Sequence, residues 1–142
     1  MSVPLLEAGF PNLTKSGYSI TSPATKQYNC IAWAAGKDNL WLWPDPPPYA
    51  YWPEEPRELS LASFLRVFHS FGYERCEDAI YEEGYEKVAL YLKDSLPTHM
   101  ARQLPSGLWT SKCGKLEDIS HTLDGLENSI YGEVAVILKR PK

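Results

Sequence analysis

The stretch KVALYLKDSLPTHMARQLPSGLWTSKCG, residues 87–114, decides the fold because it carries three successive runs of strand-forming residues. These predicted strands cover 87–93, 98–104 and 108–114. Pro105 and Gly107 stand at turn positions between the second and third runs, so we expect those two runs to pair as an antiparallel hairpin. With a fourth run, EVAVILKR at 133–140, the sequence predicts a mostly antiparallel sheet of about four strands.

Two helices are predicted ahead of this sheet. Ser60 is a suitable N-cap for SLASFLRVFHSFG, whose apolar residues recur at three- and four-residue steps until a glycine ends the pattern. Asn29 can cap a shorter helix that begins at Cys30. One more helical turn is expected around 122–127. Because helices precede sequential strands, the expected class is α+β, with short helices packed on one face of the sheet.

The remaining segments are expected to be irregular. A chain of 142 residues has the size of one domain, so we expect a single domain over 1–142. Residues 1–28 are rich in Pro, Gly, Ser and Thr and predict an irregular N-terminal arm. The segment WLWPDPPPYAYWPEEP, residues 41–56, predicts a loop, because proline lacks a backbone N–H and is excluded from the interior of helices and sheets.

The composition argues against some classes of partner and indicates a cellular compartment. A net charge of -4 gives no cationic field that would attract nucleic acid or an anionic membrane, so neither is an expected partner. No signal peptide and no run of eighteen apolar residues is present, and a cytoplasmic location is expected. The three cysteines are odd in number and widely spaced, which favours reduced thiols. Without a paired metal-ligand motif, neither a metal nor another cofactor is expected.

Cys30 is the candidate nucleophile. A thiol at a helix N-terminus faces unpaired N–H groups and the positive end of the helix dipole, and both stabilise the thiolate. His99, near the start of a predicted strand, is the candidate base that would exchange the proton of this thiol. The alternative for Cys30 is a buried core residue, and for His99 a strand histidine with local hydrogen bonds.

This order, a cysteine opening a helix and then a histidine starting a strand, resembles papain-like cysteine peptidases and amidases, especially the compact bacterial NlpC-like and CHAP-like domains. The resemblance implies a papain-like fold with Cys30 as nucleophile and His99 as base. Three residues are candidates for the third catalytic role: Ser111 on the following strand, and Asp118 and His121, whose three-residue spacing would place them together on one helical turn. The phrases YNCIAWA and PTHMARQLPSGLWTSK also resemble an uncharacterised bacterial domain family.

Five residues are candidates for contact with a peptide or protein substrate: Gln27, Asn29, Trp33, Trp43 and Trp52. Gln27 could donate to an oxyanion, and the tryptophans could form the wall of a groove. The expected function is a cysteine hydrolase or amidase acting on an amide or isopeptide bond. Two alternatives are a non-catalytic protein-interaction module, such as an immunity, toxin-associated or adaptor protein, and a deamidase-type toxin that modifies a protein glutamine.

Overall fold

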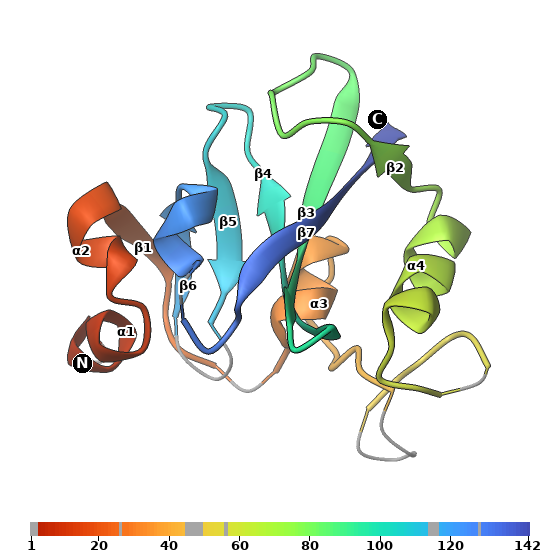
Figure 1. The fold of residues 1–142 in the computed structure, drawn as a ribbon, viewed down its shortest axis with the longest axis horizontal. Helices are drawn as coiled ribbons and strands as arrows, with labels where there is room; N and C mark the ends of the chain where they lie inside the picture. Colours follow the sequence, from red (N-terminus) through yellow and green to blue (C-terminus); the bar gives the residue numbers. More distant parts are fainter. Residues whose placement is uncertain (1–2, 26, 45–49, 56, 114–116, 128) are drawn as a thin grey trace.

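The computed structural model describes residues 3–25, 27–44, 50–55, 57–113, 117–127 and 129–142 (Figure 1). Its main element is an antiparallel seven-stranded sheet with the order β1-β6-β5-β4-β3-β7-β2. The strands are β1 (Tyr18–Ser22), β2 (Glu74–Cys76), β3 (Tyr85–Lys93), β4 (Leu96–Gln103), β5 (Trp109–Lys112), β6 (Asp118–His121) and β7 (Glu133–Pro141). The helices are α1 (Val3–Gly9), α2 (Asn12–Ser16), α3 (Cys30–Ala34), α4 (Leu61–Ser70) and the 3-10 turn η1 (Leu123–Leu126).

The prediction of a four-stranded sheet is wrong, although each of its four runs is a strand, namely β3, β4, β5 and β7. The three missed strands, β1, β2 and β6, have only three to five residues each. Such short segments carry little periodic signal and are held by their neighbours in the sheet. The strand β6, for example, lies between β5 and β1.

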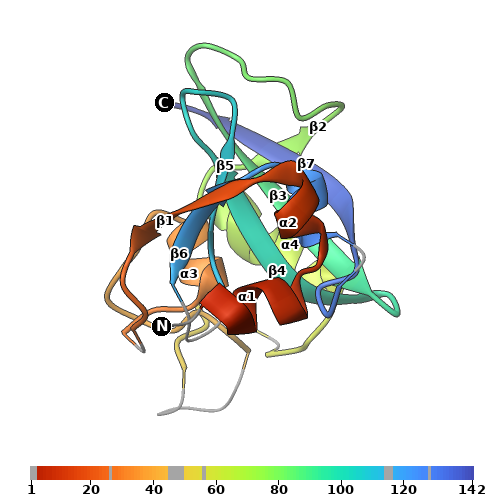
Figure 2. The same ribbon diagram turned by 90° about the vertical axis from the view of Figure 1, so that its left-hand side faces the viewer.

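Helices cover both faces of the sheet, which corrects the prediction of one covered face (Figure 2). On the first face, which we call the α3/α4 face, β-strand residues such as Leu90 and Met100 pack against Ile31 and Phe64. On the second, the α1/η1 face, Tyr91 and Ala101 belong to a cluster with residues of α1, α2 and η1. Nothing in this arrangement establishes the papain-like fold that the resemblance implied.

The N-terminal arm is more regular than its composition predicts. It contains α1, α2 and β1, because Leu6, Phe10 and Leu13 are 0–3% exposed and cover the α1/η1 face. Burying three such side chains contributes several kcal/mol, about 1.5–3 kcal/mol each, which offsets part of the entropy cost of ordering the segment. The signal for order was therefore in isolated apolar residues and not in a repeating pattern.

The two predicted helix starts are confirmed in detail. The side-chain oxygen of Asn29 accepts a hydrogen bond from the N–H of Ala32 at 3.1 Å, and that of Ser60 accepts from the N–H of Ser63 at 3.2 Å. Asn29 also forms two hydrogen bonds with the backbone of Leu42, at 2.9 and 3.0 Å. Asn29 therefore ties α3 to the segment that follows it, besides capping the helix.

Candidate functional site

The Cys30 thiol opens α3 as predicted, but it is closed into the core of the α3/α4 face. The residue is 7% exposed and belongs to the same hydrophobic cluster as Ile31 and Met100. Burial raises the pKa of this thiol to about 11, and the backbone N–H groups of Met100 and Ile31 offset only part of that rise. Burial therefore favours the thiol over the thiolate at Cys30.

His99 lies on the opposite face of the sheet from Cys30. Its imidazole stacks on the Tyr131 ring, with centroids 4.0 Å apart, and meets the Tyr91 ring edge-on at 5.4 Å. Successive side chains of a strand point to opposite faces, and it is Met100, the next residue, that packs on the α3 side. The predicted contact between Cys30 and His99 is therefore wrong, since β4 separates the sulfur from the ring.

His99 instead belongs to a buried chain of hydrogen bonds. The Ser111 Oγ atom lies 2.9 Å from the Nε2 atom of His99 and 2.7 Å from the Nε2 atom of His121. The Nδ1 atom of His121 contacts the carbonyl oxygen of Thr122 at 2.6 Å. Three of the predicted catalytic residues are thus in contact, around the serine.

The donor and acceptor of each of these hydrogen bonds follow from the Thr122 carbonyl, which ends the series. A carbonyl oxygen only accepts, so the Nδ1 atom of His121 must carry the proton. Burial lowers the pKa of His121 to about 4, so the ring is neutral near pH 7 and its Nε2 atom accepts from the Ser111 hydroxyl. Ser111 must then accept from the Nε2–H of His99, whose pKa burial also lowers, well below the usual value.

A serine that donates to a histidine is the first contact of many nucleophilic sites, but this one is sealed. Ser111 and His99 are 0% exposed and His121 is 1% exposed. The Nδ1 atom of His99 is buried without a hydrogen-bond partner. Because all three side chains are buried, the arrangement favours a structural role for them.

Asp118 lies on the other side of the sheet from His121, which corrects their predicted place on one helical turn. They are the two ends of β6, and a separation of three residues in a strand points them to opposite faces. A carboxylate oxygen of Asp118 accepts from the Tyr28 hydroxyl at 2.5 Å, and the Lys112 ammonium lies 5.5 Å from the centre of the Tyr28 ring. Burial raises the pKa of Asp118, and the hydrogen bond from Tyr28 partly offsets that rise.

The candidate substrate-binding residues do not gather around an open groove. Gln27 is exposed, whereas Asn29 is buried as a cap. Trp33 is partly buried and donates from Nε1 to the Thr110 Oγ1 atom at 3.0 Å. Neither Tyr28 nor Thr110 was predicted from the sequence as a partner, because only the folded sheet brings them to Asp118 and Trp33.

The aromatic loop packs inward in the part that the structure describes. Trp43 and Trp52 both contact the Phe64 ring of α4, with centroids 5.5 and 5.0 Å apart. Trp52 also donates from Nε1 to the Ser63 Oγ atom at 3.2 Å. These two residues cover the core and do not form a wall for a ligand; residues 45–49 and 56 of the predicted loop lie outside the described residues.

An open hollow of about 470 Å³ lies elsewhere, between α4 and β2. Leu65, Arg66 and His69 of α4 form one side, Arg75 of β2 belongs to the other, and the buried side chains of Tyr73 and Leu138 also line it. Helix α4 was predicted from its apolar repeat, and no role was predicted for its other face. The only signal for the hollow was that Leu65 belongs to the apolar repeat while basic residues follow it.

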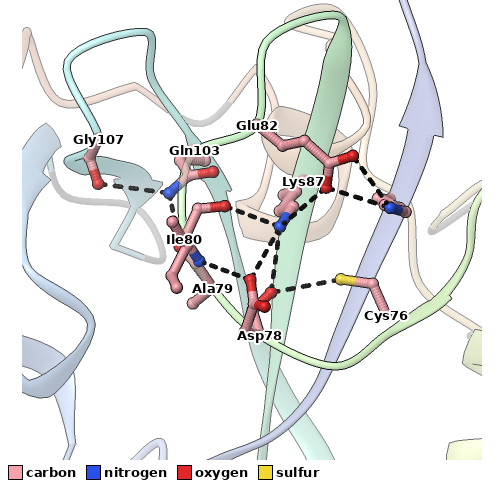
Figure 3. Close-up of polar contacts among 9 residues, drawn as sticks. Cys76, Asp78, Ala79, Ile80, Glu82, Lys87, Gln103 and Gly107 are labelled. Atoms are coloured by element: carbon pink, nitrogen blue, oxygen red, sulfur yellow. Dashed lines mark hydrogen bonds and ion pairs between the residues drawn. The ribbon is translucent and has the colours of Figure 1, made fainter.

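The segment after β2 is held in place by one buried ammonium group (Figure 3). Lys87, on β3 and 3% exposed, donates to the carbonyl oxygen of Ile80 at 2.7 Å and to Asp78 Oδ1 at 3.2 Å. It also lies 3.5 Å from a carboxylate oxygen of Glu82, which in turn pairs with Lys139 of β7 at 3.1 Å. These contacts tie the β2–β3 connection to the body of the sheet.

Two features of the described residues bear on ligands and membranes. Among them, no group of three or more His, Cys, Asp or Glu side chains could hold a metal ion. Within the same ranges, no helix combines the length and the apolar character needed to span a membrane. The three cysteines are free thiols.

Comparison with known proteins gives one match. The family described as a domain of unknown function (DUF7689) matches residues 19–139. No curated protein and no solved structure matches the chain.

Proposed function

The chain belongs to the DUF7689 family of domains of unknown function, and we propose that it acts as a protein-interaction module without catalytic activity. The observation that supports this proposal most is a difference in solvent exposure between two parts of the molecule. The thiol, the imidazoles and the serine that could support catalysis are 0–7% exposed, whereas the hollow between α4 and β2 opens at the surface beside a sheet edge. Open apolar hollows with a few polar groups are typical of binding sites.

The hydrolase and deamidase hypotheses have less support. Both need a thiolate in contact with an imidazole. Here the sulfur and the imidazole of His99 lie on opposite faces of the sheet, and burial raises the pKa of the Cys30 thiol. We propose that the module works in the cytoplasm, a location supported by its three free thiols.

The proposal is tested by selecting binders from a displayed library of random linear peptides against the immobilised full chain. We expect enriched peptides that bind in solution with one-to-one stoichiometry by calorimetry, and equally well to the Cys30→Ala variant. In parallel, the chain is incubated with a library of fluorogenic amide substrates. Failure to enrich any peptide, or turnover that Cys30→Ala abolishes, would contradict the proposal.

A further inference from the structure

Among the described residues, no strand pairs with the side of β2 that faces away from β7. In the described sheet β2 is the terminal strand and pairs with β7 alone, through Glu74, Arg75 and Cys76. An edge strand presents backbone N–H and C=O groups that an extended chain can pair with. The hollow beside α4 adjoins this edge, so a chain that pairs with β2 would place side chains in it.

Both ends of β2 are fixed before any ligand arrives. At its start, the Gly72 and Tyr73 N–H groups donate to carbonyls of the last turn of α4 at 2.9 and 3.0 Å, and Arg140 donates to the Phe71 carbonyl at 2.9 Å. At its end, the Lys87 contacts hold the connection to β3 (Figure 3). A site that is already ordered loses little entropy on binding.

The hollow has an apolar floor and a basic rim. Arg75 is opposite Leu138 in the β2–β7 register, so both side chains point to the α4 side. Arg66 and Arg75 are exposed, and within the described residues neither forms an ion pair. Against these two guanidinium groups the lining offers one carboxylate, Glu74, in a chain whose net charge is -4.

These features select a ligand with a repeating pattern. In an extended peptide the side chains at positions i and i+2 share a face. One apolar side chain would contact Leu65 and Leu138 while an acidic side chain two positions along accepts hydrogen bonds from Arg66 or Arg75. The adjacent peptide amides and carbonyls would pair with the edge of β2.

We propose that the groove between α4 and β2 binds an extended acidic segment of a partner protein by strand addition to β2, with an apolar and an acidic side chain in the hollow. This inference rests on the proposed interaction function and assigns it a place and a ligand class. Contact with only three edge residues limits the pairing, so selectivity comes from the two side chains and from the charge of the rim.

The test uses the full chain and the fluorescein-labelled peptide TLTEVT, in which Leu and Glu are two positions apart. Fluorescence polarisation measures binding, and amide chemical-shift changes locate it. We expect shifts in β2 and in the exposed side of α4. Three control peptides accompany it: TLTKVT, TSTEVT, and TLTEVT with N-methylated backbone amides. We expect each control to bind at least about tenfold more weakly. TLTKVT loses the charge pair, TSTEVT loses the apolar contact, and the N-methylated peptide loses the strand pairing.

Substitutions that reverse the charge of the rim give the decisive comparison. Arg75→Glu and Arg66→Glu should each weaken TLTEVT binding about tenfold and strengthen binding of TLTKVT. Lys15→Glu, an exposed change on α2, makes the same change in net charge and should alter neither affinity. Thermal unfolding of each variant checks that the fold is retained.

The outcomes separate this inference from the proposed function. If selected peptides bind but the Arg66 and Arg75 variants bind them unchanged, or if the shifts map to β1 or elsewhere, the groove assignment is overturned and the interaction function stands. Equal binding of the N-methylated peptide would overturn strand addition. Concentration-dependent dimerisation that Arg75→Glu abolishes would assign the edge to a second copy of the chain and overturn the acidic partner. If no library peptide is enriched, both proposals fail.

Discussion

The two faces of the central sheet bury different kinds of polar groups. At β5 and β6 the α3/α4 face carries buried ionisable groups of both signs, Lys112 and Asp118, and Lys112 lies near the Cys30 thiol. The α1/η1 face carries the uncharged chain of His99, Ser111 and His121. Both sets are buried, and the sheet between them separates the Cys30 thiol of α3 from the His99 imidazole of β4. Strand alternation, and not distance along the sequence, decides which side chains can react together.

The largest expected effect tests whether the α3/α4 face is closed. At pH 8, a thiol with a pKa of about 11 has about 200-fold less thiolate than a simple thiol with a pKa of about 8.5, so Cys30 should react with iodoacetamide at least that much more slowly. Mass spectrometry of the folded chain measures the rates, and the partly exposed Cys76 is the internal control. Rapid alkylation of Cys30 that slows in a His99→Ala variant would restore the nucleophile hypothesis.

The second prediction tests whether the buried histidines of the α1/η1 face are uncharged in the folded protein. The folded pKa of His121, about 4, lies below the unfolded value of about 6.5, so the unfolded chain binds the extra proton between these values. The stabilising contribution is present above pH 6.5 and is lost as the pH falls, by about 2 kcal/mol at pH 5 and about 3 kcal/mol at pH 4. His99, whose pKa is also lowered, adds loss in the same direction.

Urea unfolding at pH 7, 6 and 5 measures this slope in the wild type and in His121→Gln. The variant should have a shallower dependence of unfolding free energy on pH, whatever its stability at pH 7. Parallel slopes for the two proteins would mean that the His121 ring is charged or exposed when folded.

The third effect compares adjacent residues of β5 on the two faces. Ser111→Ala leaves a buried acceptor on His121 and a buried donor on His99 unsatisfied and should cost about 3 kcal/mol of unfolding free energy. Thr110→Val, on the other face, removes one hydrogen bond from the partly buried Trp33 and should cost about 1 kcal/mol. Equal losses in urea titrations would show that the serine does not join the two histidines.

The smallest effect concerns how α3 is fixed on its face. Asn29→Ala removes a helix cap and two buried hydrogen bonds to Leu42, with an expected cost of about 2 kcal/mol. Ser60→Ala removes a cap alone, at the start of α4, and should cost about 1 kcal/mol. Thermal or urea unfolding gives both values, and a smaller loss at Asn29 than at Ser60 would contradict the link to Leu42.

Short-range sequence patterns predicted the helices and strands that they specify, but they predicted few features of the candidate site. Ser60 and Asn29 cap helices in the structure because an N-cap acts over three residues and needs no distant partner. Ser111 and His121, two of the alternatives for the third catalytic role, both lie in a buried series of hydrogen bonds with His99 and not in a triad with Cys30. The hollow at α4 was missed because it combines one side of an amphipathic helix with residues of β2 and β7 that only the folded sheet brings beside it.

By itself the sequence determined the strands β3, β4, β5 and β7, the two capped helices and the turn that joins β4 to β5, because each depends on residues within about ten positions. Only the tertiary structure decided the strands β1, β2 and β6, the face on which each side chain lies, and the edge left unpaired. Those features depend on pairing between segments far apart in the chain, where a shift of one residue moves every side chain to the other face. Cys30 and His99 are separated for that reason.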